Sequence, residues 1–272
     1  MRPAFVVLFA LCACAPEHLV QGRPYELKVP AGDDGSPLPL LILAHGYGVN
    51  GVGQDFVFPF SKQVDAKRFL YAEPHGTQDR LGRRFWNATD ECCNFEELPV
   101  DDVGFFRALI DDVKAQHPVS KVFVVGHSNG GFMTLRLACD AADVIDAVAA
   151  VSASTWNDFT RCPASKSIPV LLVHGTVDGT VPYEGRPGRY PGAIEAGKRF
   201  AHRSACTGDW ETLEPADFLD GLDGAETKKE RVTGCPTGAE VELWTLEGAG
   251  HAPTFDARWT GATFDWLTEH AR

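Results

Sequence analysis

The sequence predicts an α/β fold in which a mostly parallel β-sheet is covered by helices on both faces. Short apolar strings alternate along the chain with segments of helical periodicity, as in sheets built from β-α-β units. The strings are almost unbroken, which is typical of strands buried on both sides. They are residues 40–44 (LLILA), 69–72 (FLYA), 122–125 (VFVV), 147–151 (AVAAV) and 170–173 (VLLV).

The segments between these strings read as helices and one late hairpin. A helix is predicted to begin after Asp101, which can cap it, and to end before Pro118. Its apolar residues at helical spacing are Val103, Phe106, Leu109, Ile110 and Val113. The acidic, turn-rich stretch 207–227 is expected to be an excursion before a hairpin of residues 228–233 and 241–246. No internal repeat or linker interrupts this order, so one domain is predicted over residues 23–272.

Composition excludes several classes of protein. The 272 residues are 44% hydrophobic and 23% charged, which suits a chain with a large buried core and argues against disorder or a coiled-coil rod. Lys and Arg number 25 against 37 Asp and Glu, a formal net charge of -12. This charge repels phosphate backbones, so a nucleic-acid partner is not expected.

The amino terminus resembles an export signal. Arg2 precedes an apolar run, residues 4–11, that is too short to span a bilayer. The following Leu-Cys-Ala-Cys resembles a bacterial lipoprotein signal over residues 1–13, with cleavage before Cys14, lipid on its sulfur and a short tether over residues 14–22. Cys12 is atypical within that box, so a plain secretory signal is the alternative. We therefore expect an extracellular or cell-envelope protein whose membrane contact is at most the anchor at Cys14.

Cysteine usage agrees with export. Apart from Cys12 and Cys14, an even set of six remains, which in an exported chain predicts up to three disulfides. The expected pairs are Cys206 with Cys235 and Cys139 with Cys162, leaving Cys92 and Cys93 to each other or to an exchange with the second pair. No two Cys-x-x-Cys pairs occur, so a zinc site is not expected.

The strongest chemical motif follows the third apolar string. Residues 126–130 (GHSNG) fit G-x-S-x-G between a predicted strand and a predicted helix, the context that this motif requires. A serine on such a sharp turn has strained backbone angles, and the flanking glycines remove side chains that would collide. Ser128 is therefore the predicted nucleophile, and the positive end of the helix after it favours an oxyanion.

A serine hydroxyl needs a base, and the base needs an orienting acid. Asp178 lies on the loop after the strand at 170–173, and His251 lies on a small-residue loop after the strand at 241–246. Both loops are expected at the same edge of the sheet as Ser128. We expect His251 to take the serine proton and Asp178 to fix the imidazole tautomer. Asp158 is the alternative acid.

Acyl transfer also needs two hydrogen-bond donors for the developing oxyanion. The expected donors are the backbone amides of Asn129, directly after the nucleophile, and Tyr47, in the turn AHGYG at 44–48. His45, His127 and His174 are expected to hydrogen-bond locally and to hold these loops. No metal and no cofactor is required by this scheme.

Several segments together resemble one enzyme family. They are AHGYG, EPHGTQDRLGRRFWNATDECCN, GHSNGG, HGTVDGTVPYEG and ELWTLEGAGHAP. They look like the branch of the α/β-hydrolases that holds polyhydroxybutyrate depolymerase-like and feruloyl or acetylxylan esterase-like proteins, some of them lipoproteins. The resemblance covers nearly the whole chain from about residue 23. It implies a serine carboxylesterase with the site roles given above, and an acyl pocket lined by the segment around Trp86 and Asn87.

The expected substrate is a small or polymeric carboxylic ester. Trp86, Trp156, Phe255 and Tyr47 can present aromatic faces to a hydroxycinnamoyl ring or a polyester chain. Candidates are hydroxycinnamoyl or acetyl esters of plant polysaccharide, polyhydroxyalkanoate-type polyesters and short esters, cleaved through an acyl-enzyme by a monomer. A serine peptidase or thioesterase would use the same residues and is the alternative. A non-catalytic binding protein is disfavoured because all three site residues are present.

Overall fold

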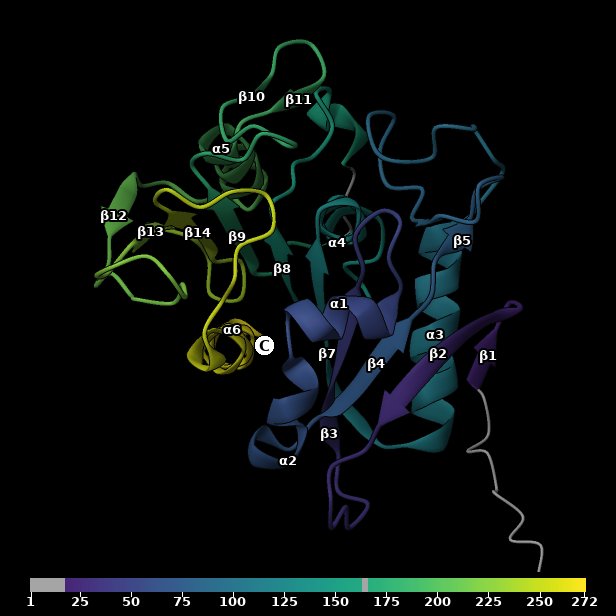
Figure 1. The fold of residues 1–272 in the computed structure, drawn as a ribbon. Helices are drawn as coiled ribbons and strands as arrows, with labels where there is room; N and C mark the ends of the chain where they lie inside the picture. The colour runs from purple at the N-terminus through teal and green to yellow at the C-terminus, as the bar shows by residue number, and fades with distance from the viewer. Residues whose placement is uncertain (1–17, 163–165) are drawn as a thin grey trace, which may run out of the picture.

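Ten strands form one sheet whose centre is parallel. The computed structural model describes residues 18–162 and 166–272, and its sheet has the order β1-β2-β4-β3-β7-β8-β9-β14-β13-β12 (Figure 1). The strands from β4 to β14 in this order run parallel, and the pairs outside them are antiparallel. Their bounds in sheet order are His18–Val20, Arg23–Lys28, Leu70–Pro74, Leu38–Ala44, Val119–His127, Ala147–Val151, Val170–Gly175, Val241–Leu246, Thr227–Val232 and Trp210–Thr212.

Helices cover both faces of this sheet. They are α1 (Gly51–Val57), α2 (Val64–Lys67), α3 (Asp102–Gln116), α4 (Asn129–Asp140), α5 (Ala193–Arg203) and α6 (Ala257–His270), with the short 3-10 helices η1 (Phe60–Gln63) and η2 (Phe159–Arg161). Two small hairpins lie outside the main sheet, β5–β6 (Thr77–Gln78 and Arg84–Phe85) and β10–β11 (Gly185–Arg186 and Tyr190–Pro191). The predicted α/β class is confirmed.

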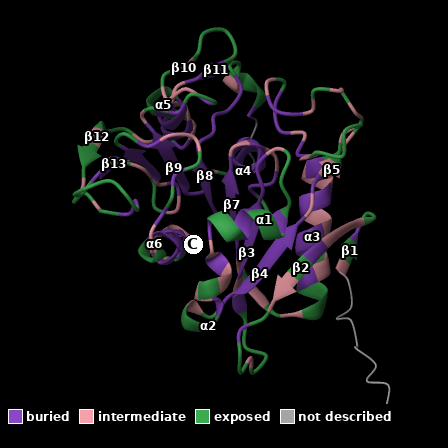
Figure 2. Cartoon of the chain, in the orientation of Figure 1, coloured by how far each residue is buried: buried purple, intermediate pink, exposed green. Residues whose placement is uncertain are grey.

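The two faces of the sheet bury separate apolar clusters. Along β3, Leu40 and Ile42 point into a cluster with α3, α4 and α5, whereas Leu41 and Leu43 point into a cluster with η1 and α6. Both sets are fully buried, and Figure 2 shows that most of each central strand is buried. This explains why the sequence of each central strand is an unbroken apolar run and not an alternating one.

The predicted elements agree with the structure, with small shifts at their ends. The five apolar strings fall within or across β3, β4, β7, β8 and β9, and the late hairpin is β13 against β14. Asp101 caps α3 by accepting from the Gly104 amide at 2.8 Å, and α3 ends at Gln116. The acidic excursion has more structure than expected, because β12 within it adds an edge strand to the hairpin.

The amino-terminal expectations lie mostly outside the described residues. This is true of the signal over residues 1–13 and of the lipid site at Cys14. The sheet begins at His18, inside the expected tether, because His18–Val20 pairs with β2. Within the part of the chain that is described, no helix combines the length and apolar character that crossing a membrane requires.

Three disulfides join six cysteines within the described part of the chain. The structure pairs Cys206 with Cys235 and Cys139 with Cys162, as the sequence analysis expected. The neighbours Cys92 and Cys93 are joined to each other, which decides between the two alternatives left open above.

Candidate active site

The three predicted catalytic residues follow three parallel strands and lie at one edge of the sheet. Ser128 directly follows β7, while Asp178 and His251 follow β9 and β14 by a few residues. In the sheet, β8 separates β7 from β9, and β14 lies beside β9. Since parallel strands end at the same edge, residues far apart in the chain meet there.

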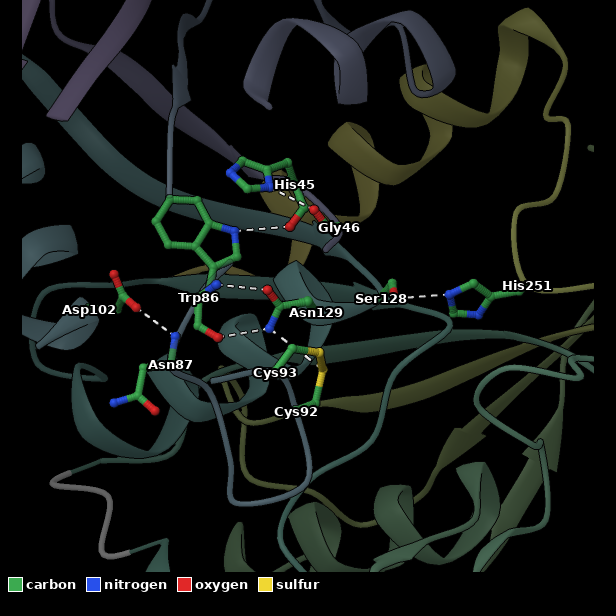
Figure 3. Close-up of a disulfide and its surroundings, with 10 residues drawn as sticks. All are labelled: His45, Gly46, Trp86, Asn87, Cys92, Cys93, Asp102, Ser128, Asn129 and His251. Carbon is green, nitrogen blue, oxygen red and sulfur yellow. Dashed lines mark hydrogen bonds between the residues drawn. A yellow bond between two sulfur atoms is a disulfide. The ribbon is translucent and has the colours of Figure 1, made fainter. Parts of the chain in front are cut away.

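The imidazole of His251 lies between the other two side chains. Its Nε2 is 2.9 Å from Ser128 Oγ, and its Nδ1 is 2.8 Å from Asp178 Oδ2. Figure 3 shows the contact between His251 and Ser128. With a proton on Nδ1 donated to Asp178, Nε2 is free to accept the serine proton, so the arrangement can activate a hydroxyl as a nucleophile.

Asp178 is held in place as a buried carboxylate. Oδ1 accepts from the amides of Thr180 and Val181 at 2.8 Å each, and Oδ2 lies 3.3 Å from His174 Nε2. Burial by itself raises the pKa of Asp178, but the hydrogen bonds from His174, His251 and the Val181 amide outweigh it and hold the pKa well below the usual range. The side chain is therefore ionised at neutral pH. The alternative acid, Asp158, caps η2 instead and contacts Thr160.

The turn at Ser128 is strained, and glycines make it possible. Ser128 has φ 52° and ψ -119°, a region that residues with side chains rarely occupy. A Cβ on Gly126 would lie 2.2 Å from the Gly130 carbonyl oxygen, and one on Gly130 would lie 2.0 Å from the Ala44 oxygen. The predicted role of the two glycines is therefore confirmed: the turn packs too closely for any side chain at these positions.

Two buried histidines hold the loops around the site. His127 Nε2 lies 2.9 Å from the His251 carbonyl oxygen, and burial lowers the pKa of His127 to about 4. His45 accepts from the Gly76 amide through Nε2 at 2.9 Å, so its Nδ1 donates to the Gly46 oxygen at 2.8 Å. Burial lowers the pKa of His45 to about 3. Both rings are neutral at pH 7 and hydrogen-bond locally, as the sequence analysis expected.

Of the two expected oxyanion donors, Asn129 directly follows the serine, and Tyr47 lines the same cavity as Ser128. Asn129 is the first residue of α4, where backbone amides have no partner within the helix. Its side chain is fully buried and clamps the backbone of Trp86: Oδ1 accepts from the Trp86 amide at 2.7 Å, and Nδ2 donates to the Trp86 oxygen at 2.9 Å. The turn at Tyr47 is held by the Gly46 amide, which donates to Gln54 Oε1 at 3.0 Å. The assignment of both amides to an oxyanion remains a prediction.

A cavity of about 350 Å³ opens on Ser128. Its other lining residues are Tyr47, Glu91, Cys92, Cys93, Phe95, Phe132, Thr180, Val181, Arg186, Arg189 and Tyr190. Aromatic rings and the disulfide make much of its wall apolar, and the two arginines add positive charge. Arg189 pairs with Glu91 at 2.5 Å, while Arg186 donates to the Thr180 oxygen at 3.0 Å.

The structure corrects the assignment of Trp86 and Asn87 to the cavity lining. Trp86 is completely buried, and its Nε1 donates to the His45 oxygen at 2.9 Å, so the ring supports the loop from beneath (Figure 3). The Asn87 side chain donates to the Val100 carbonyl oxygen, and the Asn87 backbone amide donates to Asp102. The segment that follows them does line the cavity, but through residues 91–95.

Phe255 and Trp156 are also placed differently from the expectation. Phe255 is buried and stacks on Trp259 with ring centroids 3.8 Å apart, so it is a core residue. Trp156 lines a second, smaller cavity of about 170 Å³, which shares Glu91 and Arg189 with the catalytic one. Neither ring is among the residues that line the cavity of Ser128.

Sequence reasoning missed most of the cavity wall. Phe95 is 66% exposed and packs edge-on against Tyr47, and Tyr190 packs edge-on against Phe132. The position of Phe95 beside the paired cysteines was an available signal, because a disulfide restrains its neighbours. Nothing local marks Tyr190, which reaches the site through the β10–β11 hairpin.

We predict that Gly130→Ala destabilises the protein. The new Cβ would collide with the Ala44 backbone, and overpacking of this kind costs about 1–3 kcal/mol or more of the free energy of unfolding. The measurement is unfolding in guanidinium chloride. Gly261→Ala is the matched control, since its Cβ would meet nothing closer than 3.8 Å on α6, where alanine is the better helix former. Equal stability of the Gly130 variant and the wild type would contradict the packing described here.

We also predict that the free energy of unfolding falls as the pH is lowered from 6.5 to about 4. His127 stays neutral in the folded protein until about pH 4, whereas the unfolded chain takes up this proton near pH 6.5. Protons therefore favour the unfolded state between these values, and His45 acts in the same direction. Denaturant titrations at several pH values check this. A stability that stays constant over the interval would be incompatible with neutral, buried rings.

Known proteins that are similar in sequence to this chain include esterases. The family model described as alpha/beta hydrolase fold matches residues 69–164. The protein NocK of Nocardia uniformis subsp. tsuyamanensis, named as an esterase, is 26% identical over an alignment covering 93% of this chain and 75% of NocK. Feruloyl esterase B of Piromyces equi is 28% identical over 85% of this chain, and the alignment spans 42% of that longer protein.

A solved structure supports the same fold. Acetyl xylan esterase from Aspergillus awamori superposes with a TM-score of 0.62 at 14% identity, covering 90% of this chain and 94% of that one. The strand order, the turn at Ser128 and these similarities agree. The chain therefore has the α/β-hydrolase fold, and its sequence is similar to those of feruloyl esterases and of a bifunctional acetylxylan esterase/xylanase.

Proposed function

We propose that the protein is a serine carboxylic-ester hydrolase that works through an acyl-enzyme. The observation that carries this proposal is the position of His251, within hydrogen-bond distance of both Ser128 Oγ and Asp178 Oδ2. A histidine so placed can take a proton from the hydroxyl while the carboxylate stabilises the imidazolium that forms. The neighbouring cavity gives an ester room to reach the serine.

The first half of the reaction makes the acyl-enzyme. Ser128 Oγ attacks the ester carbonyl carbon as its proton passes to His251 Nε2. The carbonyl oxygen becomes an oxyanion that accepts from the amides of Tyr47 and Asn129. When the intermediate collapses, the bond to the alcohol breaks, and the alcohol oxygen takes the proton from His251.

The second half returns the free enzyme. A water molecule gives a proton to His251 Nε2 and attacks the acyl carbon through the same kind of oxyanion. Collapse of this intermediate releases the carboxylic acid, and the proton returns to Ser128 Oγ. Asp178 stays ionised throughout, consistent with its lowered pKa.

The relatives favour esters of plant cell-wall polysaccharide. Feruloyl esterases and a bifunctional acetylxylan esterase/xylanase are among the proteins similar to this chain. The rings of Phe95, Phe132 and Tyr190 give the cavity the apolar, aromatic wall that a hydroxycinnamoyl group requires. We therefore infer that feruloyl and acetyl esters are substrates. Polyester cleavage is the less supported alternative.

The three disulfides fit an oxidising compartment outside the cytoplasm. Extracellular polysaccharide esters would be accessible there. Lipidation at Cys14 remains a prediction that palmitate labelling of wild type and of Cys14→Ser can check.

Ser128→Ala is expected to lower kcat for p-nitrophenyl acetate by about 10⁴-fold or more, because the hydroxyl that forms the acyl-enzyme is removed. Circular dichroism should show an unchanged fold. Ser120→Ala, an exposed serine on the same strand β7, is the matched control and should keep wild-type activity. Turnover that survives in the Ser128 variant would refute the proposed nucleophile.

Among natural esters, we expect methyl ferulate and acetylated xylan to be hydrolysed with higher kcat/KM than a short polyhydroxybutyrate oligomer. The reason is the aromatic cavity wall together with the similarity to feruloyl and acetylxylan esterases. Initial rates on the three substrates at equal enzyme concentration give the order. If the polyester oligomer is the best substrate, the inferred substrate class is wrong.

A further inference from the structure

The disulfide between Cys92 and Cys93 lies in the wall of the catalytic cavity. Both cysteines line the same cavity as Ser128, and each is 8% exposed. The aromatic pair Tyr47 and Phe95 lines the cavity with them. An ester bound at Ser128 would therefore share a cavity of about 350 Å³ with both residues of this disulfide.

The disulfide is fixed to the residue directly after the nucleophile. Asn129 Nδ2 lies 3.6 Å from Cys92 Sγ, and the same buried amide clamps the backbone of Trp86 (Figure 3). Thr89 and Cys92 also exchange backbone hydrogen bonds, at 2.9 Å and 3.2 Å. The Asn129 side chain thus holds both ends of the span from Trp86 to Cys92, which restrains the start of the wall formed by residues 91–95.

Stabilisation of the fold does not explain a disulfide at this place. A cross-link restricts the unfolded chain more when it closes a longer loop. The sequence separation is 1 for Cys92–Cys93, against 23 for Cys139–Cys162 and 29 for Cys206–Cys235. The pair of neighbours closes almost no loop, so its contribution by this route is small.

The other two disulfides lie away from Ser128. Cys139 is on α4 and Cys162 follows η2, while Cys206 lines a separate cavity with Trp210. Neither pair is among the residues that line the catalytic cavity. The Cys92–Cys93 disulfide therefore differs from the other two in its position at the catalytic cavity.

We propose that the Cys92–Cys93 disulfide is a specificity-determining wall of the acyl site: a fixed, apolar sulfur surface against which the aromatic acyl group of the substrate packs. Sulfur makes favourable contacts with aromatic rings, and a restrained surface loses little conformational entropy when a ligand packs on it. An acetyl group, with a single methyl, needs little of this surface. The inference rests on the proposed ester hydrolysis at Ser128 and names the group that the site selects.

The test compares two variants that each lack one disulfide. Cys92→Ala/Cys93→Ala removes the sulfur wall, and Cys206→Ala/Cys235→Ala is the matched control. Rates on methyl ferulate and p-nitrophenyl acetate are divided by the number of sites that react with a small phosphonate, so that only folded enzyme counts. In the first variant, the ratio of kcat/KM for methyl ferulate to kcat/KM for p-nitrophenyl acetate is expected to fall about tenfold or more.

The control variant should lose thermal stability but keep the wild-type ratio of the two kcat/KM values. A merely structural role for Cys92–Cys93 would lower both activities by the same factor, and that result would overturn the inference. If the wild type hydrolyses neither ester, the proposed function itself fails. If the wild type is active and the first variant keeps the wild-type ratio, only the proposed acyl wall is refuted.

A second measurement needs no variant and covers the case in which the alanine protein does not fold. The wild type is crystallised after reaction of Ser128 with a phosphonate that carries a phenylpropenyl group. The phenyl ring is expected in contact with the sulfur atoms of Cys92 and Cys93. A ring seated against another part of the cavity would overturn the inference.

Discussion

One imidazole must reach two partners at once, and much of this structure serves that requirement. His251 bonds to Ser128 and Asp178 across distances that tolerate little error, yet the three residues are separated by 50 or more positions in the chain. Parallel strands solve the problem, because β7, β9 and β14 end at one edge of a sheet whose register is fixed by its own hydrogen bonds. The buried clusters on both faces keep that edge in place.

Close packing at this edge explains which small and polar residues surround it. Gly126 and Gly130 let α4 approach β3 and β7 within backbone contact, which exposes the serine at the cost of a strained turn. Buried histidines then satisfy the carbonyl and amide groups that the loops leave unpaired. The close packing around Gly126 and Gly130 therefore keeps the Ser128 backbone in its strained conformation.

The sequence revealed the parts of the molecule that depend on local chemistry. Strands buried on two faces are continuous apolar runs, and a nucleophile on a sharp turn needs glycines at fixed offsets, so β3, β7, β9 and the site at Ser128 could be predicted. The cavity wall could not, because it depends on which side of a loop each ring faces. Trp86 and Phe255 are as aromatic as Phe95 and Tyr190, but tertiary packing buries the first two and leaves the others at the cavity.

The bond from His127 to the carbonyl of His251 has a mechanical consequence. His127 directly precedes Ser128 in the chain. The loop that carries His251 is therefore hydrogen-bonded to the residue next to the nucleophile. The position of the base relative to the nucleophile is therefore set by two contacts, the bond between the two side chains and this link between their backbones.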